Sequence, residues 1–307
     1  MKKDEIFNEL KTLITESRNP DTTEIDIMST EEIVYLINRE DHKVAPAVAQ
    51  EIPYIIQAVE LISNAFRNGG RLIYIGAGTS GRLGILDAVE CPPTFGTDPE
   101  MVQGIIAGGS ISLIQAQEGS EDDQQKGIID IREIKINDKD VVCGIAASQR
   151  TPYVLGALIE SKKIGAKTIF LICNPRSEVK FNADVLICPV PGPEIIMGST
   201  RMKAGSAQKM VLNILTTASM IKLGKVYENL MIDLQPNSKK LIERSKRIIM
   251  IVAEVSYEEA NNFLRQANGQ LKPAILMAMT KLDLTSAKDL LDRNGGFIKK
   301  ALNELRT

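Results

Sequence analysis

Two hydroxyl-bearing residues, Thr79 and Ser80, stand inside a glycine-rich turn directly after a short apolar run, residues 72–75. Such a turn predicts the start of a helix, where unpaired backbone N–H groups and the positive end of the helix dipole attract an anion. The hydroxyls add hydrogen-bond donors, which suit a phosphate monoester better than the less charged bridge of a diester. We therefore expect Gly78, Thr79, Ser80 and Gly81 to bind a phosphate group.

The same turn leaves two other interpretations open. Residues 76–81 formally match G-x-G-x-x-G, the dinucleotide-binding fingerprint, which needs an acidic residue at the end of the next strand. That strand is expected to run into residues 105–109, which contain no acid. The residues therefore favour a phosphate monoester over a dinucleotide, and a purely structural turn remains the third interpretation.

A second run of hydroxyls follows another predicted strand, residues 140–146. Thr151 is placed as an N-cap with Pro152 at the first helical position, so Ser148 and Thr151 would lie at a second helix N-terminus. An ordinary capped helix explains this stretch equally well. Two hydroxyl-rich helix starts in one sheet nevertheless favour a shared anion.

Acid–base chemistry is expected from carboxylates, lysines or tyrosines, because the only histidine, His42, stands among charges typical of a solvated surface. Glu90 ends a predicted helix, residues 80–90, at a Cys-Pro-Pro break, and Glu121 lies in an acidic helix start. Surface exposure is the ordinary interpretation of both glutamates. Ser199, Arg201 and Lys203 form a polar entrance to a long helix, where the two cations contact an anionic substrate or are simply solvated.

The composition excludes several classes of protein. A net charge of −2 and a pI near 5.7 provide no basic surface for nucleic acid or an anionic membrane. No apolar run approaches the roughly 18 residues of a membrane span, and the first 16 residues form a charged amphipathic pattern rather than a signal peptide. The four cysteines lack metal-site spacing, so we expect no metal. Three of them stand in Val/Ile-rich runs and are expected to be buried thiols.

The pattern of the chain predicts an α/β fold with a doubly wound, parallel, five-stranded sheet. Short continuous apolar runs are typical of strands that are covered on both faces. We expect an N-terminal helical segment (1–58), an α/β domain (59–224) and a C-terminal helical region without strands (225–307), in which Ser256 and Glu259 form a capping box. The expected strands are 71–75, 102–107, 140–146, 167–172 and 184–188.

The chain resembles the N-acetylmuramic acid 6-phosphate etherases, enzymes of the sugar-isomerase (SIS) fold. Residues 76–93 together with 199–209 are highly specific for this family, and residues 15–20, 25–30, 118–122 and 146–153 also match. The resemblance implies a cytoplasmic lyase of amino sugar recycling that releases D-lactate without a metal or nicotinamide cofactor. It also implies a homodimer whose subunits share site residues.

The resemblance assigns roles to individual residues. Glu90 would protonate the departing lactate, Glu121 would remove the proton at C2 of the sugar, and Thr79, Ser80, Ser148 and Thr151 would bind the phosphate. Gln149 departs from the family, which usually has glycine there, so a positive φ at this position would carry a cost. Two alternatives share the fold: a non-catalytic sugar-phosphate sensor, which needs no matched acid and base, and a sugar-phosphate isomerase, which releases no lactate.

Overall fold

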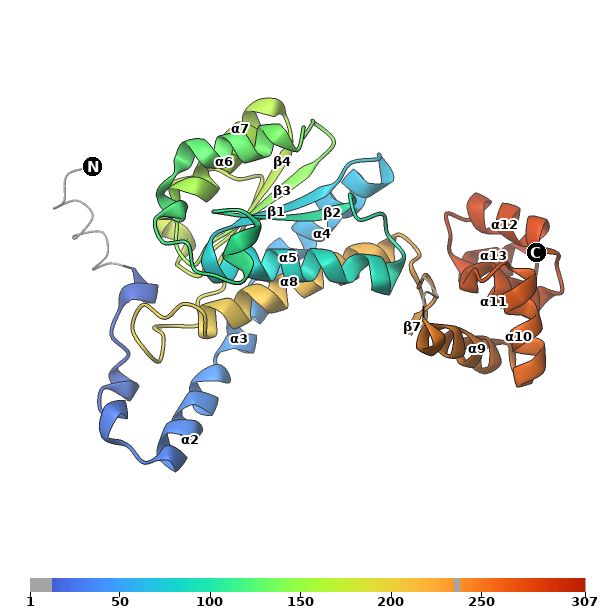
Figure 1. Cartoon of the computed structure of the whole chain (residues 1–307), viewed down its shortest axis with the longest axis horizontal. Coiled ribbons are helices and arrows are strands. Elements are labelled where there is room, and N and C mark those ends of the chain that lie inside the picture. Colours follow the sequence, from blue (N-terminus) through green and yellow to red (C-terminus); the bar gives the residue numbers. More distant parts are fainter. Residues whose placement is uncertain (1–12, 235–237, 307) are drawn as a thin grey trace. The chain divides into compact units, whose positions relative to one another are not determined.

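The computed structural model describes residues 13–234 and 238–306 (Figure 1). Most of the amphipathic start predicted for the first 16 residues, residues 1–12, lies outside this part. The described residues form two compact units. The first comprises residues up to 88 together with 100–216, and the second comprises 89–99 together with 217 onward.

The first unit is built around a five-stranded parallel sheet. The strand order is β2-β1-β3-β4-β5, with neighbours in parallel register, for example Gly76 of β1 opposite Ile106 of β2 and Ile145 of β3. The predicted five-stranded parallel sheet is confirmed, and its two central strands, β1 and β3, are buried at every position. The strands are β1 (Leu72–Gly76), β2 (Val102–Ile106), β3 (Val141–Ile145), β4 (Lys167–Leu171) and β5 (Val185–Ile187).

Helices cover both faces of the sheet (Figure 1). Ile73 and Ile75 of β1 pack with Tyr153 on one face, whereas the ring of Tyr74 lies against Gly84 on the other. Since the chain winds outward in both directions from β1 and β3, a switch point lies between these strands, where doubly wound folds bind ligands. One face carries α6 (Gln124–Glu133) and α7 (Pro152–Ile164); the other carries α4 (Ile52–Arg67), α5 (Gly78–Phe95) and α8 (Lys203–Lys222).

Short helices precede the sheet and connect its strands. Ser29 is the N-cap of α2 and forms a capping box with Glu32. Residues 44–67 form two helices rather than one, because the chain turns at Glu51 before Pro53. These elements are α2 (Thr30–Asp41), α3 (Val44–Gln50) and the 3-10 turns η1 (Ile14–Glu16), η2 (Pro20–Thr22), η3 (Ile25–Ile27), η4 (Ser110–Leu113), η5 (Ser120–Asp122) and η6 (Arg176–Glu178).

The second unit is mainly helical and has its own apolar core, which includes Ile249, Leu264 and Ile275. The capping box of Ser256 and Glu259 is confirmed. The elements are β6 (Val226–Tyr227), β7 (Leu230–Met231), α9 (Lys239–Ala253), α10 (Tyr257–Gln266), α11 (Leu271–Thr280), α12 (Leu284–Arg293) and α13 (Ile298–Glu304).

Two expectations about these residues are wrong. β6 and β7 form a small antiparallel pair in the region predicted to lack strands. The expected break at Cys91-Pro92-Pro93 is absent, because α5 continues through both prolines to Phe95. Cys91 and Phe95 are buried, and we attribute the continuation to this burial, which offsets the hydrogen bonds that proline cannot donate.

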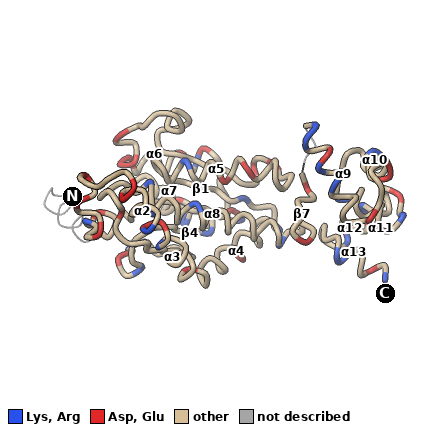
Figure 2. Tube along the Cα trace, turned by 90° about the horizontal axis from the view of Figure 1, so that it is seen from below, with Lys and Arg blue, Asp and Glu red and all other residues tan. Residues whose placement is uncertain are grey.

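Lysines and arginines are interspersed among acidic residues along the described chain (Figure 2). No helix in the described ranges has the length and apolar character needed to cross a membrane. Across the same residues, no group of three or more His, Cys, Asp or Glu side chains is arranged to hold a metal ion. All four cysteines are buried, which confirms the expectation of buried thiols.

Candidate active site

The first loop, residues 76–81, comprises the end of β1 and the first residues of α5 at the carboxyl edge of the sheet. Gly78 has a φ of +53°, which an L-residue rarely adopts. A Cβ at Gly81 would lie 2.6 Å from Cγ1 of Ile106 and 2.8 Å from the carbonyl oxygen of Gly76. Backbone packing therefore fixes this loop, and the first N–H groups of α5 have no preceding helical carbonyl to bond.

The second loop, residues 146–151, joins β3 to α7. Thr151 is the N-cap residue, as predicted, but its hydroxyl makes no capping hydrogen bond. Ser148 Oγ accepts a hydrogen bond from the N–H of Arg150 at 3.3 Å. Gln149 has no positive φ, and its Oε1 accepts from the N–H of Lys180 at 3.0 Å. The backbone at Gln149 is therefore not in the left-handed region, and its side chain is hydrogen-bonded to the backbone of Lys180.

A cavity of about 920 Å³ lies where these two loops meet. It brings together six residues predicted for the site, which come from three separate stretches of the chain: Gly78, Thr79, Ser80, Glu121, Ser148 and Thr151. The hydroxyls come from the helix starts that follow β1 and β3, the two strands at the switch point. The arrangement can therefore bind an anion between two helix N-termini, with a carboxylate in the same cavity.

Charged residues that sequence reasoning missed also line this cavity. Glu16, Arg150 and Lys180 are among its lining residues. Arg150 lies within the second loop, so its place beside the hydroxyls could have been inferred from the sequence. Glu16 and Lys180 carry no such signal, because tertiary packing alone brings them to the loops.

Other predicted site residues lie outside the lining of the cavity. Glu90 is exposed and follows Gly78 in the same helix by a rise of about 18 Å. Gly81, the last residue of the first loop, is buried and does not line the cavity. Ser199 and Arg201 do not line the cavity. The residue between them, Thr200, lines it together with Gly198.

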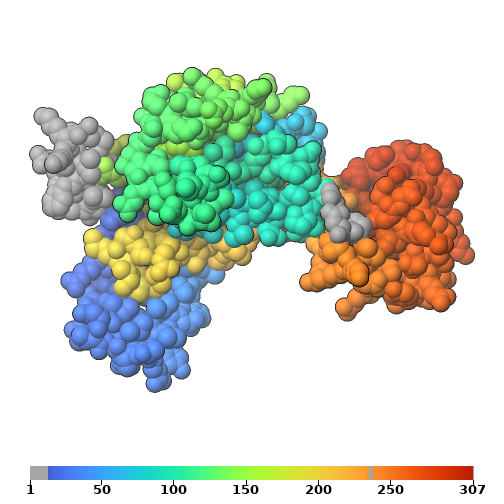
Figure 3. Space-filling model, viewed as in Figure 1, coloured from blue at the N-terminus to red at the C-terminus, as the bar shows by residue number. Residues whose placement is uncertain are grey.

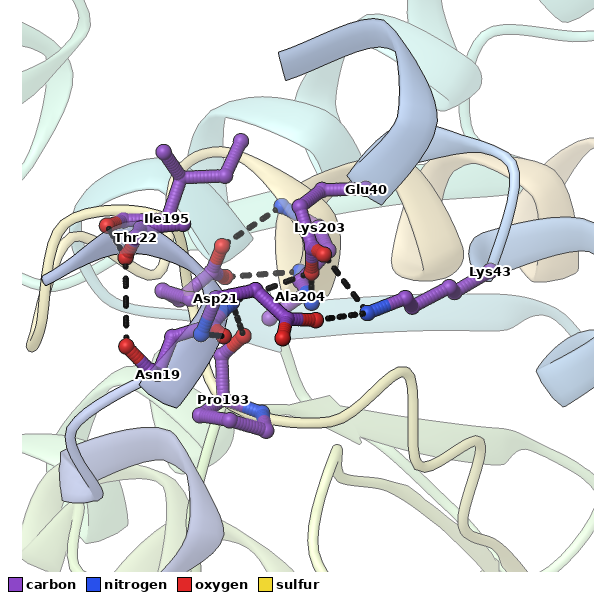
Figure 4. A network of polar contacts seen from close by, with 10 residues as sticks. Asn19, Asp21, Thr22, Glu40, Lys43, Pro193, Ile195, Lys203 and Ala204 are labelled. Atoms are coloured by element: carbon purple, nitrogen blue, oxygen red, sulfur yellow. Dashed lines mark hydrogen bonds and ion pairs between the residues drawn. The ribbon is translucent and has the colours of Figure 1, made fainter. Parts of the chain in front are cut away.

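Lys203 is neither solvated nor part of the cavity lining. Its side chain is fully buried, and Nζ lies 2.7 Å from Oε2 of Glu40, which is also fully buried. Figure 4 shows this pair at the centre of a polar network that joins α2 to the start of α8. Asn19 donates to Glu40 Oε2 at 3.0 Å, and Lys43 lies 2.6 Å from Oε1. A buried ammonium group needs such a partner, and that requirement accounts for the position of Lys203.

The pKa values of two buried carboxylates in this network, Glu40 and Glu194, are shifted in opposite directions. Burial raises the pKa of Glu40, but hydrogen bonds from Lys203, Lys43 and Asn19 outweigh it and lower the pKa to about 2. Burial raises the pKa of Glu194, and the N–H groups of Ala204 and Lys203 only partly oppose that effect. Glu194 accepts both N–H bonds at 2.9 Å, so it caps the N-terminus of α8.

The N-terminal segment, residues 13–22, forms part of the cavity wall. Asn174 holds it through the N–H of Ile14, which donates to Oδ1 at 3.1 Å, while Nδ2 donates to the carbonyl of Ala147 in the second loop at 3.0 Å. Thr22 donates to the carbonyl of Ile195 at 2.8 Å. Figure 3 shows the segment around 190–203, in yellow, beside the blue N-terminal residues.

The chain is similar to curated proteins along nearly its whole length. It is 51% identical to an N-acetylmuramic acid 6-phosphate etherase of Salinibacter ruber, over 97% of this chain and 96% of that protein. It is 52% identical to the protein of the same name from Clostridioides difficile, over 98% and 99%. The protein of that name from Photorhabdus laumondii is 51% identical, over 97% and 99%.

Two further comparisons concern the α/β part. The family model of the glucokinase regulatory protein N-terminal SIS domain matches residues 54–162. A solved structure of phosphoheptose isomerase GmhA from Neisseria gonorrhoeae covers 61% of this chain and 97% of its own, with 16% identity and a TM-score of 0.47.

Proposed function

Because this chain belongs to the family of N-acetylmuramic acid 6-phosphate etherases, we propose that it cleaves the D-lactyl ether of N-acetylmuramic acid 6-phosphate. The products are N-acetylglucosamine 6-phosphate and D-lactate, which makes the protein a carbon–oxygen lyase. The observation that carries this conclusion is identity of about half over almost the full length of relatives with this name. A cavity that joins two hydroxyl-rich helix starts to a carboxylate supports it.

Phosphate binding is the first role of the site. Thr79, Ser80, Ser148 and Thr151, together with N–H groups at the start of α5, bind the phosphoryl group at C6. Charge-assisted hydrogen bonds of this kind are about twice as strong as neutral ones. Anchoring the far end of the sugar holds C2 and C3 at a fixed distance from the catalytic carboxylates, which lowers the entropic cost of reaction.

The chemistry is an elimination followed by a hydration. In the ring-opened sugar, the C1 aldehyde acidifies the proton on C2, and Glu121 removes it as the general base. The C2–C3 double bond forms as the C3–O bond breaks, and Glu90 gives the leaving lactyl oxygen its proton. Water then adds a hydroxyl group to C3 and a proton to C2. Glu121 must therefore be deprotonated when it accepts the C2 proton, whereas Glu90 must be protonated when it donates to the lactyl oxygen.

Glu90 takes part only if a second copy supplies it. It is exposed on α5 and does not line the cavity of its own chain. The apolar residues beside it, Leu86 and Val89, are 49% and 57% exposed, as expected for a helix face that packs on a partner. We therefore propose a homodimer in which Glu90 of one subunit completes the site of the other. A cytoplasmic location and a lack of nucleic-acid partners complete this proposal.

The reaction is tested by incubating the purified protein with N-acetylmuramic acid 6-phosphate and measuring D-lactate. We expect lactate release by the wild type and none by Glu90→Gln or Glu121→Gln variants that retain the wild-type fold by circular dichroism. A sensor or an isomerase would release no lactate. Wild-type rates in both variants would contradict the assigned roles.

The sharing of the site is tested with mixed dimers. Co-expression of differently tagged Glu90→Gln and Glu121→Gln chains gives a heterodimer with one fully native site if Glu90 acts across the interface. That heterodimer should show about half of the wild-type rate, because a symmetric dimer has two equivalent sites. If Glu90 acted within its own chain, every site would carry one substitution and the heterodimer would be inactive.

A further inference from the structure

Ser80 and Gln208 form a buried pair behind the proposed phosphate site. Ser80 lines the cavity and is 7% exposed, whereas Gln208, on α8, is 1% exposed. The Ser80 hydroxyl donates to Oε1 of Gln208 at 2.9 Å. The amide nitrogen of Gln208, Nε2, has no hydrogen-bond partner among the described residues. A buried polar group in this state is destabilising, because it has lost its hydrogen bonds to water without replacement.

The close approach of α8 to the first loop makes this contact available. Gly205 precedes Gln208 by one helical turn, so the two lie on one face of α8. A Cβ at Gly205 would lie 3.4 Å from Cγ2 of Thr79. The helix therefore lies within van der Waals contact of the loop at this position, and the longer glutamine side chain reaches Ser80 from the same face.

The direction of the Ser80–Gln208 bond matters for anion binding. A serine hydroxyl has one proton and two lone pairs. While the proton is donated to Gln208, Ser80 offers the cavity only lone pairs, which repel a phosphate oxygen. A half-turn of the terminal amide brings Nε2 to Ser80 Oγ, where it donates. The hydroxyl proton is then free for the phosphoryl group.

We propose that Gln208 is a positioning residue that donates from Nε2 to Ser80 Oγ and thereby directs the Ser80 proton to the phosphoryl group of the ligand. The unpartnered Nε2, the buried contact and the place of Ser80 in the cavity together carry this inference. It rests on the proposed function, because it assigns the anion that Ser80 contacts. Gln208 acts through Ser80 and is not assigned a contact with the ligand.

A double-mutant cycle tests the coupling. Calorimetric affinities for N-acetylglucosamine 6-phosphate are compared for the wild type, Ser80→Ala, Gln208→Met and the double variant. Methionine keeps the length of glutamine without its hydrogen bonds. A bond to a charged group contributes about 1.5–3 kcal/mol, so each single change should weaken binding about 10- to 100-fold. The double variant should bind no more weakly than the weaker single variant, because both changes remove one interaction.

Gln208→Glu supplies a readout that a purely structural role would not move. A protonated glutamic acid can donate to Ser80, whereas the carboxylate can only accept and also repels the phosphate. Relative to Gln208→Met, this variant should lose affinity as the pH rises, and the loss should track the titration of the new carboxyl group. A constant ratio between the two variants across pH would overturn the proposal.

The remaining outcomes separate this inference from the proposed function. Inorganic phosphate binding, measured by the shift in Tm, is determined for the same variants. Additive losses in the cycle, or unchanged affinity in Gln208→Met, would overturn the role of Gln208. A wild type that binds phosphate and obeys the cycle but releases no D-lactate would overturn the etherase reaction alone. A wild type that binds neither anion would overturn both.

Discussion

The cavity has two walls that are built in different ways. One wall consists of the loops that follow β1 and β3, where Gly76 and Gly81 pack so tightly that no side chain fits between them. The other wall consists of the N-terminal segment and residues 198–200, which no strand supports. Buried polar side chains hold this second wall, chiefly Asn174 and the pair of Glu40 with Lys203.

The difference separates two ways of positioning a site. The shape of the loop wall is set by backbone sterics, because it depends on the absence of a Cβ atom at positions such as Gly76 and Gly81. The second wall depends on charges and amides that must find partners far away in the sequence, since Glu40 and Lys203 are 163 residues apart. We expect the loss of stability caused by substitutions in the second wall to vary with pH and to change when both partners are replaced. In the first wall, the loss should vary with the size of the new side chain.

The largest expected effect comes from Glu40→Gln. Removing one partner of a buried ion pair costs about 3–5 kcal/mol, because the other charge stays buried. The pKa of Glu40 is lowered to about 2, so the stability that it contributes is present above about pH 4.5 and is lost as the pH falls toward 2. The difference in free energy of unfolding between wild type and variant, measured in urea, should therefore shrink over that range.

The matched control for this prediction is the double variant Glu40→Met, Lys203→Met. It removes both buried charges and keeps apolar volume, so it should be much more stable at pH 7 than Glu40→Gln. If Glu40→Gln had the same stability as the wild type at pH 7, or a difference that did not change down to pH 2, the ion pair would not be what holds the second wall.

A smaller effect is expected from Gly81→Ala in the loop wall. The new Cβ would lie 2.6 Å from Ile106 and 2.8 Å from the backbone of Gly76, and relief of that overlap costs about 2–3 kcal/mol. Gly78→Ala is the control, since its Cβ meets nothing within 4 Å and adds only the strain of a positive φ, about 1 kcal/mol. Urea unfolding should rank the two in that order at every pH, and equal losses would contradict the steric account.

The two walls also differ in how far the sequence predicts them. The strands and both loops could be predicted, because runs of apolar residues mark strands buried on two faces and hydroxyls beside glycine or proline mark the helix starts. Glu16 and Lys180 could not, because only folding brings them to the loops. The residue type of Lys203 predicts contact with solvent or substrate. Its actual partner, Glu40, cannot be inferred from the local pattern of the sequence. Local spacing therefore predicts the backbone of the site better than its long-range side-chain contacts.

Asn174→Ala tests the link between the walls and should have an intermediate effect. Asn174 is 1% exposed and bonds both to Ile14 in the second wall and to Ala147 in the second loop. Its loss leaves those groups without their partner, at about 1–2 kcal/mol. We expect KM for the sugar phosphate to rise about tenfold, with Asn174→Asp retaining the bond from Ile14 and part of the affinity. A KM equal to that of the wild type would separate the N-terminal segment from the site.

Gln149→Gly should have the smallest effect and sharpens the contrast within the loop wall itself. Glycine is the usual residue of the family at this position, yet Gln149 has no positive φ, so the backbone does not require glycine here as it does at Gly81. The substitution removes the bond to the N–H of Lys180 and adds freedom to the unfolded chain, which together cost about 0.5–1 kcal/mol. Urea unfolding measures this loss, and the KM should change less than about threefold. A tenfold lower KM would instead mean that the glutamine side chain obstructs the phosphate, and the second loop would then depend on side-chain size as strictly as the first.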